Sequence, residues 1–292
     1  MRLLLTAGIL LAAVAAVAAG RTTRRAVALE PVLDMYSKPT READVVSQAR
    51  YAQTVEVLEE QGEFWRVKTP DEYPGWVEAR CVRVLGESEQ YPSQGEVATV
   101  EALAAHIYRE NSVTRHRPLL TVPFETRLEV VEQPVAEESR WIAVRLPDDR
   151  KGWIQRGDVA LETRVLAVHD LIELARRFVG RPYTWGGTTS FGYDCSGFTQ
   201  MLCRRGGRDI PRDSSKQAVW EGMLEVRREE LRAGDLLYFG PTLARVNHTG
   251  FYIGNGEFIH STTDSRPAVQ VSRLDDEPWT RLLVACRRWT KP

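Results

Sequence analysis

A pattern of short alternating strands occurs twice in the first half of the chain and limits the folds open to it. Within each copy, hydrophobic residues alternate with polar ones, which is typical of strands with one buried face. Pro, Asp and Gly separate the segments. The segments are 55–59, 64–68 and 75–77 in the first copy, and 128–132, 141–145 and 152–154 in the second. We therefore predict two small all-β barrels in tandem, over 26–88 and 95–162.

Both copies end in a Gly-Trp pair, which contains Trp76 in the first copy and Trp153 in the second. Two tandem units that end a hairpin in this way resemble bacterial SH3-like domains. A large aromatic side chain is usually buried. We therefore interpret both tryptophans as core residues of the barrels in preference to ligand contacts.

The second half of the chain changes to a helical period. Apolar residues recur every three or four positions from Val165 to Phe178, and Gly180 and Pro182 end this amphipathic helix. After a loop rich in Gly and aromatic residues, we expect a second helix to begin at or beside Cys195. Alternating segments then predict strands at 236–239, 249–253, 257–260 and 282–287. Helices followed by strands indicate an α+β domain, over 166–290.

The N-terminus has the features of an export signal. Arg2 precedes an unbroken apolar run that ends in small residues at Ala19, so we predict a signal peptide over 1–19 that is removed. A spanning helix needs about 20 apolar residues, which leaves an uncleaved anchor as the alternative. No Cys follows the run to carry a lipid. The mature protein is therefore expected to be periplasmic or secreted, without stable insertion into a membrane.

Charge and cysteine spacing argue against two further classes of protein. The chain has 39 Lys and Arg against 40 Asp and Glu, a formal net charge of -1, so no global basic field favours nucleic acid as a partner. The four cysteines of an exported chain could form disulfides. However, Cys81, Cys195, Cys203 and Cys286 are widely spaced and form no CxxC pair. We expect buried thiols among them rather than a disulfide framework.

Cys195 and two histidines form a candidate catalytic set. A thiol is a nucleophile as the thiolate, and a helix N-terminus together with an imidazolium can lower its pKa. His248 and His260 fall on consecutive predicted strands of the same domain. His248 would then deprotonate Cys195, and His260 would hold the other ring nitrogen of His248. A nucleophile on a helix, followed by a base and an orienting residue on strands, suits a papain-like core.

Five local motifs strengthen this interpretation. They are Tyr-Thr-Trp-Gly-Gly at 183–187, Asp-Cys-Ser-Gly-Phe at 194–198, Gly-Asp-Leu-Leu-Tyr-Phe at 234–239, His-Thr-Gly-Phe-Tyr-Ile-Gly at 248–254 and Phe-Ile-His-Ser at 258–261. In this order they strongly resemble the NlpC-type cell-wall cysteine peptidases, over about residues 166–290. The resemblance implies an α+β, papain-like NlpC-type domain preceded by two SH3-like barrels.

The resemblance also implies roles for single residues. Cys195 matches the family's nucleophile, His248 its general base and His260 its third, polar member. Tyr183 matches a tyrosine that lies beside the nucleophile and helps the oxyanion, although a loop aromatic that packs on the helix is the alternative. The bond implied is the γ-D-glutamyl linkage to a diamino acid in peptidoglycan stem peptides. The mechanism implied is acyl transfer through a thioester.

Residues beside the nucleophile are implied to bind substrate. Asp194 and Ser196 flank Cys195, and in relatives with this motif they help to bind the carboxylate and amide groups of D-Glu. Asp194 could instead merely cap the helix, which Asp does well. Trp185, in the loop before Cys195, is counted with the substrate-binding residues.

Tandem SH3-like domains before an NlpC-type domain look like the γ-D-glutamyl-L-diamino acid endopeptidases, which act on small muropeptides with a free N-terminal L-Ala. The resemblance implies that Asp213 pairs with the substrate ammonium and that Ser214 contacts the peptide. Tyr73 in the first barrel is implied to reach the catalytic Cys. Asp44 matches a second acidic residue, commonly Glu in relatives, so its side chain is one methylene shorter. Solvated surface carboxylates are the alternative for Asp213 and Asp44.

The charge arrangement has a physical consequence for specificity. Two carboxylates around one ammonium would reject an N-acylated substrate that has lost its charge, and a barrel wall would exclude attached glycan. We therefore predict an enzyme of muropeptide recycling or trimming, whose partners are peptidoglycan stem peptides or muropeptides.

Three alternatives remain. The first is a D,L-endopeptidase that cuts intact peptidoglycan, with the barrels as wall-binding modules. The second is a non-catalytic adaptor that binds cell-wall peptides, against which the intact set of Cys195, His248 and His260 speaks. The third is a zinc site on these residues, but no HExxH or CxxC spacing is present. We expect no metal and no other cofactor.

Overall fold

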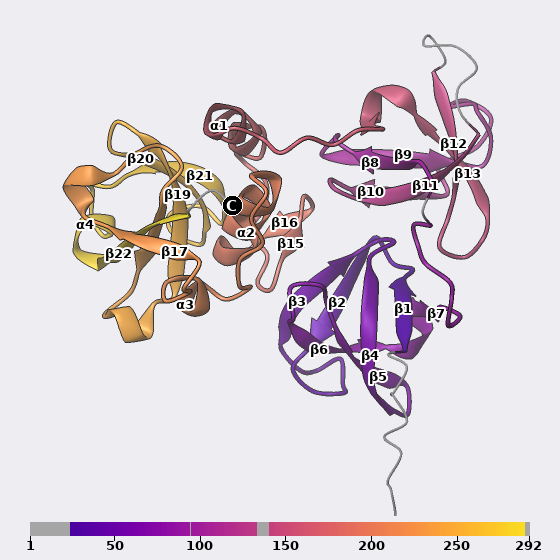
Figure 1. The fold of residues 1–292 in the computed structure, drawn as a ribbon, viewed down its shortest axis with the longest axis horizontal. Coiled ribbons are helices and arrows are strands. Elements are labelled where there is room, and N and C mark those ends of the chain that lie inside the picture. The colour runs from indigo at the N-terminus through magenta and orange to yellow at the C-terminus, as the bar shows by residue number, and fades with distance from the viewer. Residues whose placement is uncertain (1–23, 94, 133–139, 290–292) are drawn as a thin grey trace, which may run out of the picture.

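The computed structural model describes residues 24–93, 95–132 and 140–289. Along the chain its elements form three groups, which Figure 1 shows in indigo to purple, in magenta to pink, and in orange to yellow. We call them the first β-unit, the second β-unit and the C-terminal unit. The signal peptide predicted over 1–19 lies outside the described residues.

The first β-unit is one seven-stranded sheet with the strand order β3-β2-β6-β5-β4-β1-β7. Its strands are β1 (Arg25–Ala28), β2 (Val32–Tyr36), β3 (Val45–Arg50), β4 (Thr54–Gln61), β5 (Phe64–Lys68), β6 (Pro74–Glu78) and β7 (Val82–Val84). All neighbouring strands are antiparallel. Inward-facing Val, Ala, Leu and Met side chains form its core.

The second β-unit repeats this order position by position, as β10-β9-β13-β12-β11-β8-β14. Its strands are β8 (Val97–Val100), β9 (Ala104–Tyr108), β10 (Leu120–Pro123), β11 (Arg127–Glu132), β12 (Trp141–Arg145), β13 (Lys151–Gln155) and β14 (Val159–Ala160). The repeat in the sequence is thus a repeat of strand topology. In the described pairings β3 and β7, and likewise β10 and β14, remain edge strands, so neither sheet is closed into a full barrel.

The two Gly-Trp tryptophans do not belong to the cores, so that prediction was wrong. In β6 Gly75 faces the core, and Met35 fills the space where a side chain at this position would lie. Successive strand residues point to opposite faces, so Trp76 lies on the outer face and is partly exposed. Trp153 is also partly exposed, and its ring lies 4.8 Å from Nζ of Lys151. In β6 the glycine of the pair therefore faces the core, and the tryptophan faces outward.

The C-terminal unit combines helices with a six-stranded antiparallel sheet of order β17-β22-β18-β19-β20-β21, which confirms the α+β prediction. Its helices are α1 (Val168–Arg177), α2 (Cys195–Arg205), α3 (Ser214–Gln217) and α4 (Trp279–Leu282). Its strands are β15 (Thr188–Thr189), β16 (Gly192–Tyr193), β17 (Met223–Val226), β18 (Leu236–Phe239), β19 (His248–Gly254), β20 (Glu257–Thr262), β21 (Ala268–Arg273) and β22 (Leu283–Trp289). The four predicted strands are β18, β19, β20 and β22.

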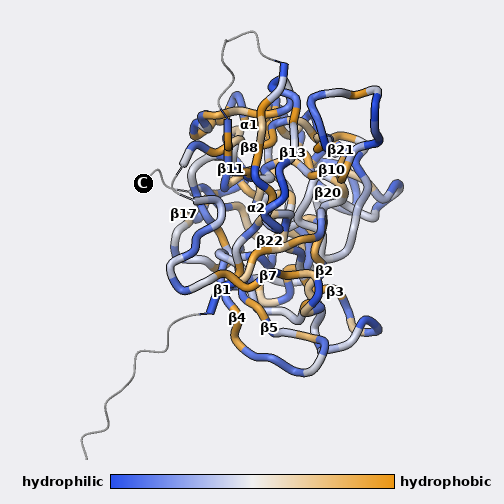
Figure 2. The backbone as a smooth tube through the Cα atoms, turned by 90° about the vertical axis from the view of Figure 1, so that its right-hand side faces the viewer, coloured by the Kyte–Doolittle hydropathy of each residue, from blue (hydrophilic) through white to orange (hydrophobic). Residues whose placement is uncertain are grey.

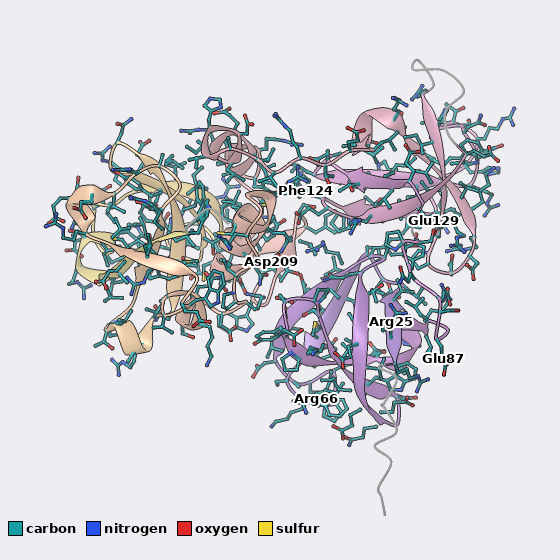
Figure 3. All side chains as sticks on the ribbon, in the orientation of Figure 1. Arg25, Arg66, Glu87, Phe124, Glu129 and Asp209 are labelled. Carbon is teal, nitrogen blue, oxygen red and sulfur yellow. The ribbon has the colours of Figure 1, made fainter. Side chains whose placement is uncertain are left out.

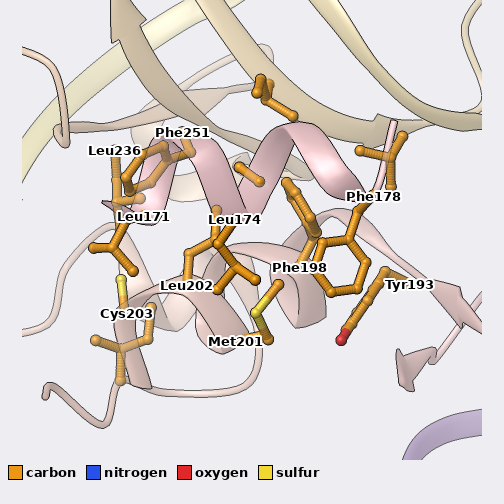
Figure 4. Packing of buried hydrophobic residues seen from close by; sticks show 14 of the residues in the cluster. Leu171, Leu174, Phe178, Tyr193, Phe198, Met201, Leu202, Cys203, Leu236 and Phe251 are labelled. Atoms are coloured by element: carbon orange, nitrogen blue, oxygen red, sulfur yellow. The ribbon is translucent and has the colours of Figure 1, made fainter. Parts of the chain in front are cut away.

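The helix α2 occupies the centre of the C-terminal unit. Every residue from Cys195 to Cys203 is buried, because α1 covers one side of the helix and the sheet covers another. The apolar face of α1 supplies Leu171 and Leu174 to this core, beside Phe198 of α2 (Figure 4). Figure 2 shows the same division along the backbone, with hydrophobic segments in the strands and hydrophilic ones in outer loops. Within the described residues, no helix has the length and apolar character needed to cross a membrane.

Phe124 joins the second β-unit to the C-terminal unit. Its ring is fully buried and meets Phe178 edge to face, with 5.5 Å between the ring centroids. Figure 3 labels Phe124 at the side of the second β-unit that faces α2. The backbone N–H of Phe124 donates to Oγ of Ser190 at 2.9 Å, and the adjacent Glu125 accepts from Nη2 of Arg204 at 2.6 Å. An aromatic anchor and a buried ion pair therefore hold the two units together.

The first β-unit contacts the C-terminal unit along β3. Both the backbone N–H and the hydroxyl of Thr188 donate to Gln48, at 3.1 and 3.0 Å. From α2, Nε2 of Gln200 donates to Asp71 at 2.9 Å. Residues of all three units line a cavity of about 620 Å³ at their junction, and Cys195 is not part of its lining. The unit that carries Cys195 is thus in contact with both β-units.

Candidate active site

Cys195 is the first residue of α2, as the sequence predicted. Asp194 is the N-cap, and its Oδ1 accepts from the backbone N–H of Gly197 at 2.7 Å. A side chain at Gly197 would collide with the carbonyl oxygen of Gly187, which would lie only 2.2 Å away. This glycine therefore lets the preceding loop pass directly over the start of the helix that begins with Cys195. The capping role offered above as the alternative for Asp194 is present.

A buried arginine ties this helix start to the first β-unit. The side chain of Arg212 is only 1% exposed. Its Nη2 and Nη1 donate to the two carboxylate oxygens of Asp194 at 2.6 and 3.0 Å. Its Nη1 also donates to Oγ of Ser196 at 2.8 Å, and its Nε donates to Oγ of Ser47 in β3 at 3.1 Å. The side chains of Asp194 and Ser196 are therefore held within the protein.

His248 and His260 contact each other, as their predicted relay requires. Nε2 of His248 lies 2.7 Å from Nδ1 of His260. Nε2 of His260 in turn lies 2.9 Å from Oγ of Ser272 on β21. Antiparallel pairing of β19, β20 and β21 places the three side chains in a row across the sheet. This leaves Nδ1 of His248 as the ring nitrogen available to a third group.

Aromatic rings enclose the histidine pair. The ring of Trp279 lies 5.1 Å from that of His248 and 4.7 Å from that of His260, between centroids. Phe239 packs on His248 at 5.7 Å and Phe258 packs on His260 at 4.5 Å. His260 is fully buried, whereas His248 keeps a partly exposed edge. An apolar enclosure of this kind disfavours the charged imidazolium.

Burial also dominates the electrostatics of Cys195. It raises the pKa of the thiol to about 12, with a further contribution from the Asp194 carboxylate, against hydrogen bonds from the backbone N–H groups of Thr249 and Ser196. Burial lowers the pKa of His248 to about 3. Both shifts favour the neutral thiol of Cys195 and the neutral imidazole of His248 over a thiolate–imidazolium pair.

The neutral forms of Cys195 and His248 lead to a prediction of how alkylation of Cys195 by iodoacetamide depends on pH. Because only the thiolate reacts, the second-order rate constant should rise roughly tenfold per pH unit from about pH 6 to about pH 9. A thiolate–imidazolium pair would instead give a plateau over this range, and that result would contradict the prediction. The rate is measured by mass spectrometry, with Cys195→Ala to subtract labelling of the other thiols.

Two of the predicted loop residues line the same region. Burial, followed by the charges of Cys195 and Asp194, raises the pKa of the Tyr183 hydroxyl. Trp185 is 69% exposed at the turn that follows. Gly186, with a φ of +73°, brings this turn against the start of β3, next to Asp44. Asp44 itself is exposed, and among the described residues no hydrogen bond or ion pair to its carboxylate is found.

Tyr73 and Asp213 meet across the interface between the first β-unit and the C-terminal unit. Burial, followed by the charge of Asp213, raises the pKa of Tyr73. Asp213 precedes α3, and its neighbour Ser214 is 9% exposed. Because Asp213 directly follows Arg212, this pair lies next to the network around Asp194. The structure thus brings Tyr73, Asp213 and Ser214 together near Cys195.

Three residues of this region had no role in the sequence interpretation. Arg212, Ser272 and Trp279 contact the predicted residues but lie 12 to 31 residues from them along the chain. Only the position of Arg212 next to Asp213 offered a signal. The four cysteines are buried and free, which confirms the buried thiols. No group of three or more His, Cys, Asp or Glu in the described parts of the chain is placed to hold a metal ion.

Comparison with known proteins agrees with this arrangement. Residues 180–288 match the NlpC/P60 family, and residues 31–83 match the bacterial SH3 domain. A γ-D-glutamyl-L-lysine dipeptidyl-peptidase of Bacillus cereus is 30% identical over 258 residues, which cover 83% of this chain and 74% of that protein. The enzyme of the same name from Bacillus subtilis is 28% identical over 254 residues, which cover 84% of this chain and 81% of that protein.

A solved structure gives the same result for the whole architecture. The crystal structure of an NlpC/P60 family protein from Bacillus cereus matches with a TM-score of 0.78 at 26% identity, covering 91% of this chain and 99% of that one. The likeness therefore includes both β-units and not only the part around Cys195. On the strength of the 30% identical relative and of the match over the segment that carries Cys195, His248 and His260, the chain belongs to the NlpC/P60 family of cysteine peptidases.

Proposed function

We propose that this enzyme hydrolyses the γ-D-glutamyl bond to a diamino acid in peptidoglycan-derived peptides that carry a free N-terminal L-Ala. Support for the bond comes from the two Bacillus relatives, which are named for a γ-D-glutamyl-L-lysine linkage. Support for the free N-terminus comes from the position of one charge: the Asp213 carboxylate follows Arg212 of the network around Asp194 and lies close enough to Tyr73 of the first β-unit for its charge to raise the pKa of that hydroxyl.

The residues around Cys195 suit acyl transfer. As substrate binds, the thiol proton passes to Nδ1 of His248, and the sulfur attacks the γ-carbonyl carbon of D-Glu. Backbone N–H groups at the start of α2, together with the Tyr183 hydroxyl, stabilise the oxyanion. His248 then gives its proton to the leaving amine of the diamino acid. Water attacks the thioester with His248 again as base, which releases the γ-carboxylate and restores the thiol.

The first β-unit closes the site at the substrate's N-terminal end. Asp213 binds the ammonium of L-Ala, Ser214 contacts the peptide, and the exposed Asp44 adds negative charge from β3. Trp185 covers the substrate from the opposite loop. A muramyl group on the L-Ala nitrogen would remove the positive charge of the ammonium. It would also collide with the wall of the first β-unit that contains Tyr73. Free peptides are then the substrates, which suits recycling or trimming of muropeptides.

The remaining parts of the chain support this site. We propose that the second β-unit is a further SH3-like domain, since it repeats the strand order of the first, and that it acts as a scaffold through Phe124. Domain limits of 26–88, 95–162 and 166–290 are part of the proposal. So is export to the periplasm or the cell exterior with loss of residues 1–19.

The N-terminal charge of the substrate tests the proposal. Mass spectrometry follows L-Ala-γ-D-Glu-diamino acid peptides and their N-acetylmuramyl forms, with lysine or diaminopimelate at the cleaved bond. We expect kcat/KM to be at least about 100-fold lower for the acylated forms, because the Asp213 carboxylate then loses its ammonium partner and is desolvated by a neutral amide. Asp213→Asn should lower kcat/KM for the free peptide by about 10- to 100-fold.

Asp209→Asn is the matched control for this experiment. Asp209 lies on the same connection as Asp213 but is exposed, so its neutralisation should leave both rates unchanged. Equal cleavage of free and acylated peptides would favour the endopeptidase of intact peptidoglycan instead. Binding of the peptides without any cleavage would favour the adaptor.

A further inference from the structure

We infer that Ser272 is a positioning residue, whose hydroxyl accepts a hydrogen bond from His260 and thereby decides which nitrogen of each imidazole carries the proton. The inference rests on the proposed function in one respect, namely that His248 is the base that accepts the Cys195 proton. Nothing in the sequence motifs points to Ser272, because it lies outside all five of them.

Strand register brings Ser272 to the end of the relay. In the β20–β21 pair, Ser272 is opposite Phe258, and Phe258 lies on the same face of the sheet as His260. This diagonal arrangement places Oγ of Ser272 2.9 Å from Nε2 of His260, while the other ring nitrogen lies 2.7 Å from His248. Both nitrogens of His260 are therefore occupied by protein groups.

The surroundings leave Ser272 as the partner that sets the proton position. His260 is 0% exposed, and the rings of Phe258 and Trp279 cover it. Among the described residues, no carboxylate, amide or backbone carbonyl is found in hydrogen-bond contact with the His260 ring. Two neutral imidazoles in contact allow two arrangements of their protons. At the far end of the row, the Ser272 hydroxyl can accept the hydrogen bond that a proton on Nε2 of His260 would donate.

Only one of these arrangements is competent for catalysis. His248 can accept the thiol proton at Nδ1 only if its own proton is on Nε2. His248 then donates to Nδ1 of His260, so His260 must carry its proton on Nε2 and donate to Oγ of Ser272. In the opposite arrangement both rings carry the proton on Nδ1. His260 then donates to Nε2 of His248, and Nδ1 of His248 cannot accept the thiol proton.

Removal of the hydroxyl takes away the acceptor that the competent arrangement needs. In Ser272→Ala, the N–H on Nε2 of His260 is buried without a partner, and such a group is costly. The proton of His260 then moves to Nδ1, and His248 follows by carrying its proton on Nδ1. We expect kcat to fall by about 10- to 100-fold, with KM nearly unchanged because Ser272 contacts no substrate group. Ser272→Thr keeps the hydroxyl and should restore most of kcat.

The proton positions can be measured without any turnover. In ¹⁵N-histidine-labelled protein, long-range proton–nitrogen spectra distinguish a protonated ring nitrogen from a bare one, and a His260→Asn variant assigns the signals. We expect protonated Nε2 and bare Nδ1 on both rings in the wild type and in Ser272→Thr, and the reverse in Ser272→Ala. If Ser272→Ala leaves these spectra unchanged, or if Ser272→Thr fails to restore them, the inference is wrong. A wild-type enzyme that is inactive on every peptide would overturn the proposed function. The spectra would still test whether Ser272 sets the proton positions on the two imidazoles.

Discussion

Replacement of Cys195 by Ala is expected to lower the turnover of the free tripeptide by about 10,000-fold or more, because no other group can form the thioester. The protein should keep its fold, since Cys195 is buried and makes no disulfide. Cys195→Ser should be nearly as inactive, because a hydroxyl is harder to deprotonate than a thiol and His248 is a weak base. Product analysis by mass spectrometry measures the loss.

Cys203→Ala is the matched control for this prediction. Cys203 is a buried thiol of the same helix, 0% exposed and away from the histidines. Its truncation should cost stability, about 1 kcal/mol for the cavity, while kcat remains within a few-fold of the wild type. Comparable loss of turnover in both variants would mean that disturbance of α2, and not removal of the nucleophile, explains the effect.

Replacement of Arg212 by Met is expected to lower the free energy of unfolding by about 3–5 kcal/mol. The change leaves the Asp194 carboxylate buried at the start of α2 without its cation, and it breaks the bond to Ser47 in the first β-unit. Activity should fall by about 100-fold or more as well, because Cys195 and the β-unit wall lose their fixed separation. Chemical denaturation and kcat/KM on the free peptide measure the two effects.

A double variant separates charge from geometry at this site. In Asp194→Asn with Arg212→Met, the unpaired charge is gone and Asn still caps the helix, so part of the lost stability should return while activity stays low. Arg212→Lys keeps the charge but not the two-pronged contact, and it should fall between the wild type and Arg212→Met. Full stability in the single Arg212→Met variant would show that the network is not what holds this interface.

Local sequence was sufficient to predict where in the fold the candidate catalytic residues lie. Cys195 lies at a helix start that its own neighbours specify, and His248 and His260 lie on strands with clear alternation. The partners of these groups could not be predicted in the same way. Ser272 reaches His260 through the register of β20 and β21, and Trp279 of α4 reaches both histidines from a segment that lies outside both of their strands.

The ionisation of the site could not be predicted from the sequence for a related reason. A helix N-terminus and a neighbouring imidazole can be identified from sequence, but the burial that outweighs them is a property of the whole fold. The exposure of the tryptophans of the β-units could not be predicted for the same reason. Gly75 identifies the inward position in β6 only once Met35 is known to pack against it.

The buried ring of Phe124 also bears on how such a protein can change over generations. Many multidomain enzymes gain or lose an accessory domain as an independent segment, because the joint is a solvated linker. Here one residue of an accessory unit belongs to the core of the unit that performs the chemistry. Deletion of the second β-unit would leave a hole beside Phe178, and exchange for another unit would have to supply an equivalent ring. In this chain the second β-unit and the C-terminal unit are therefore expected to tolerate exchange only when the contact at Phe178 is kept.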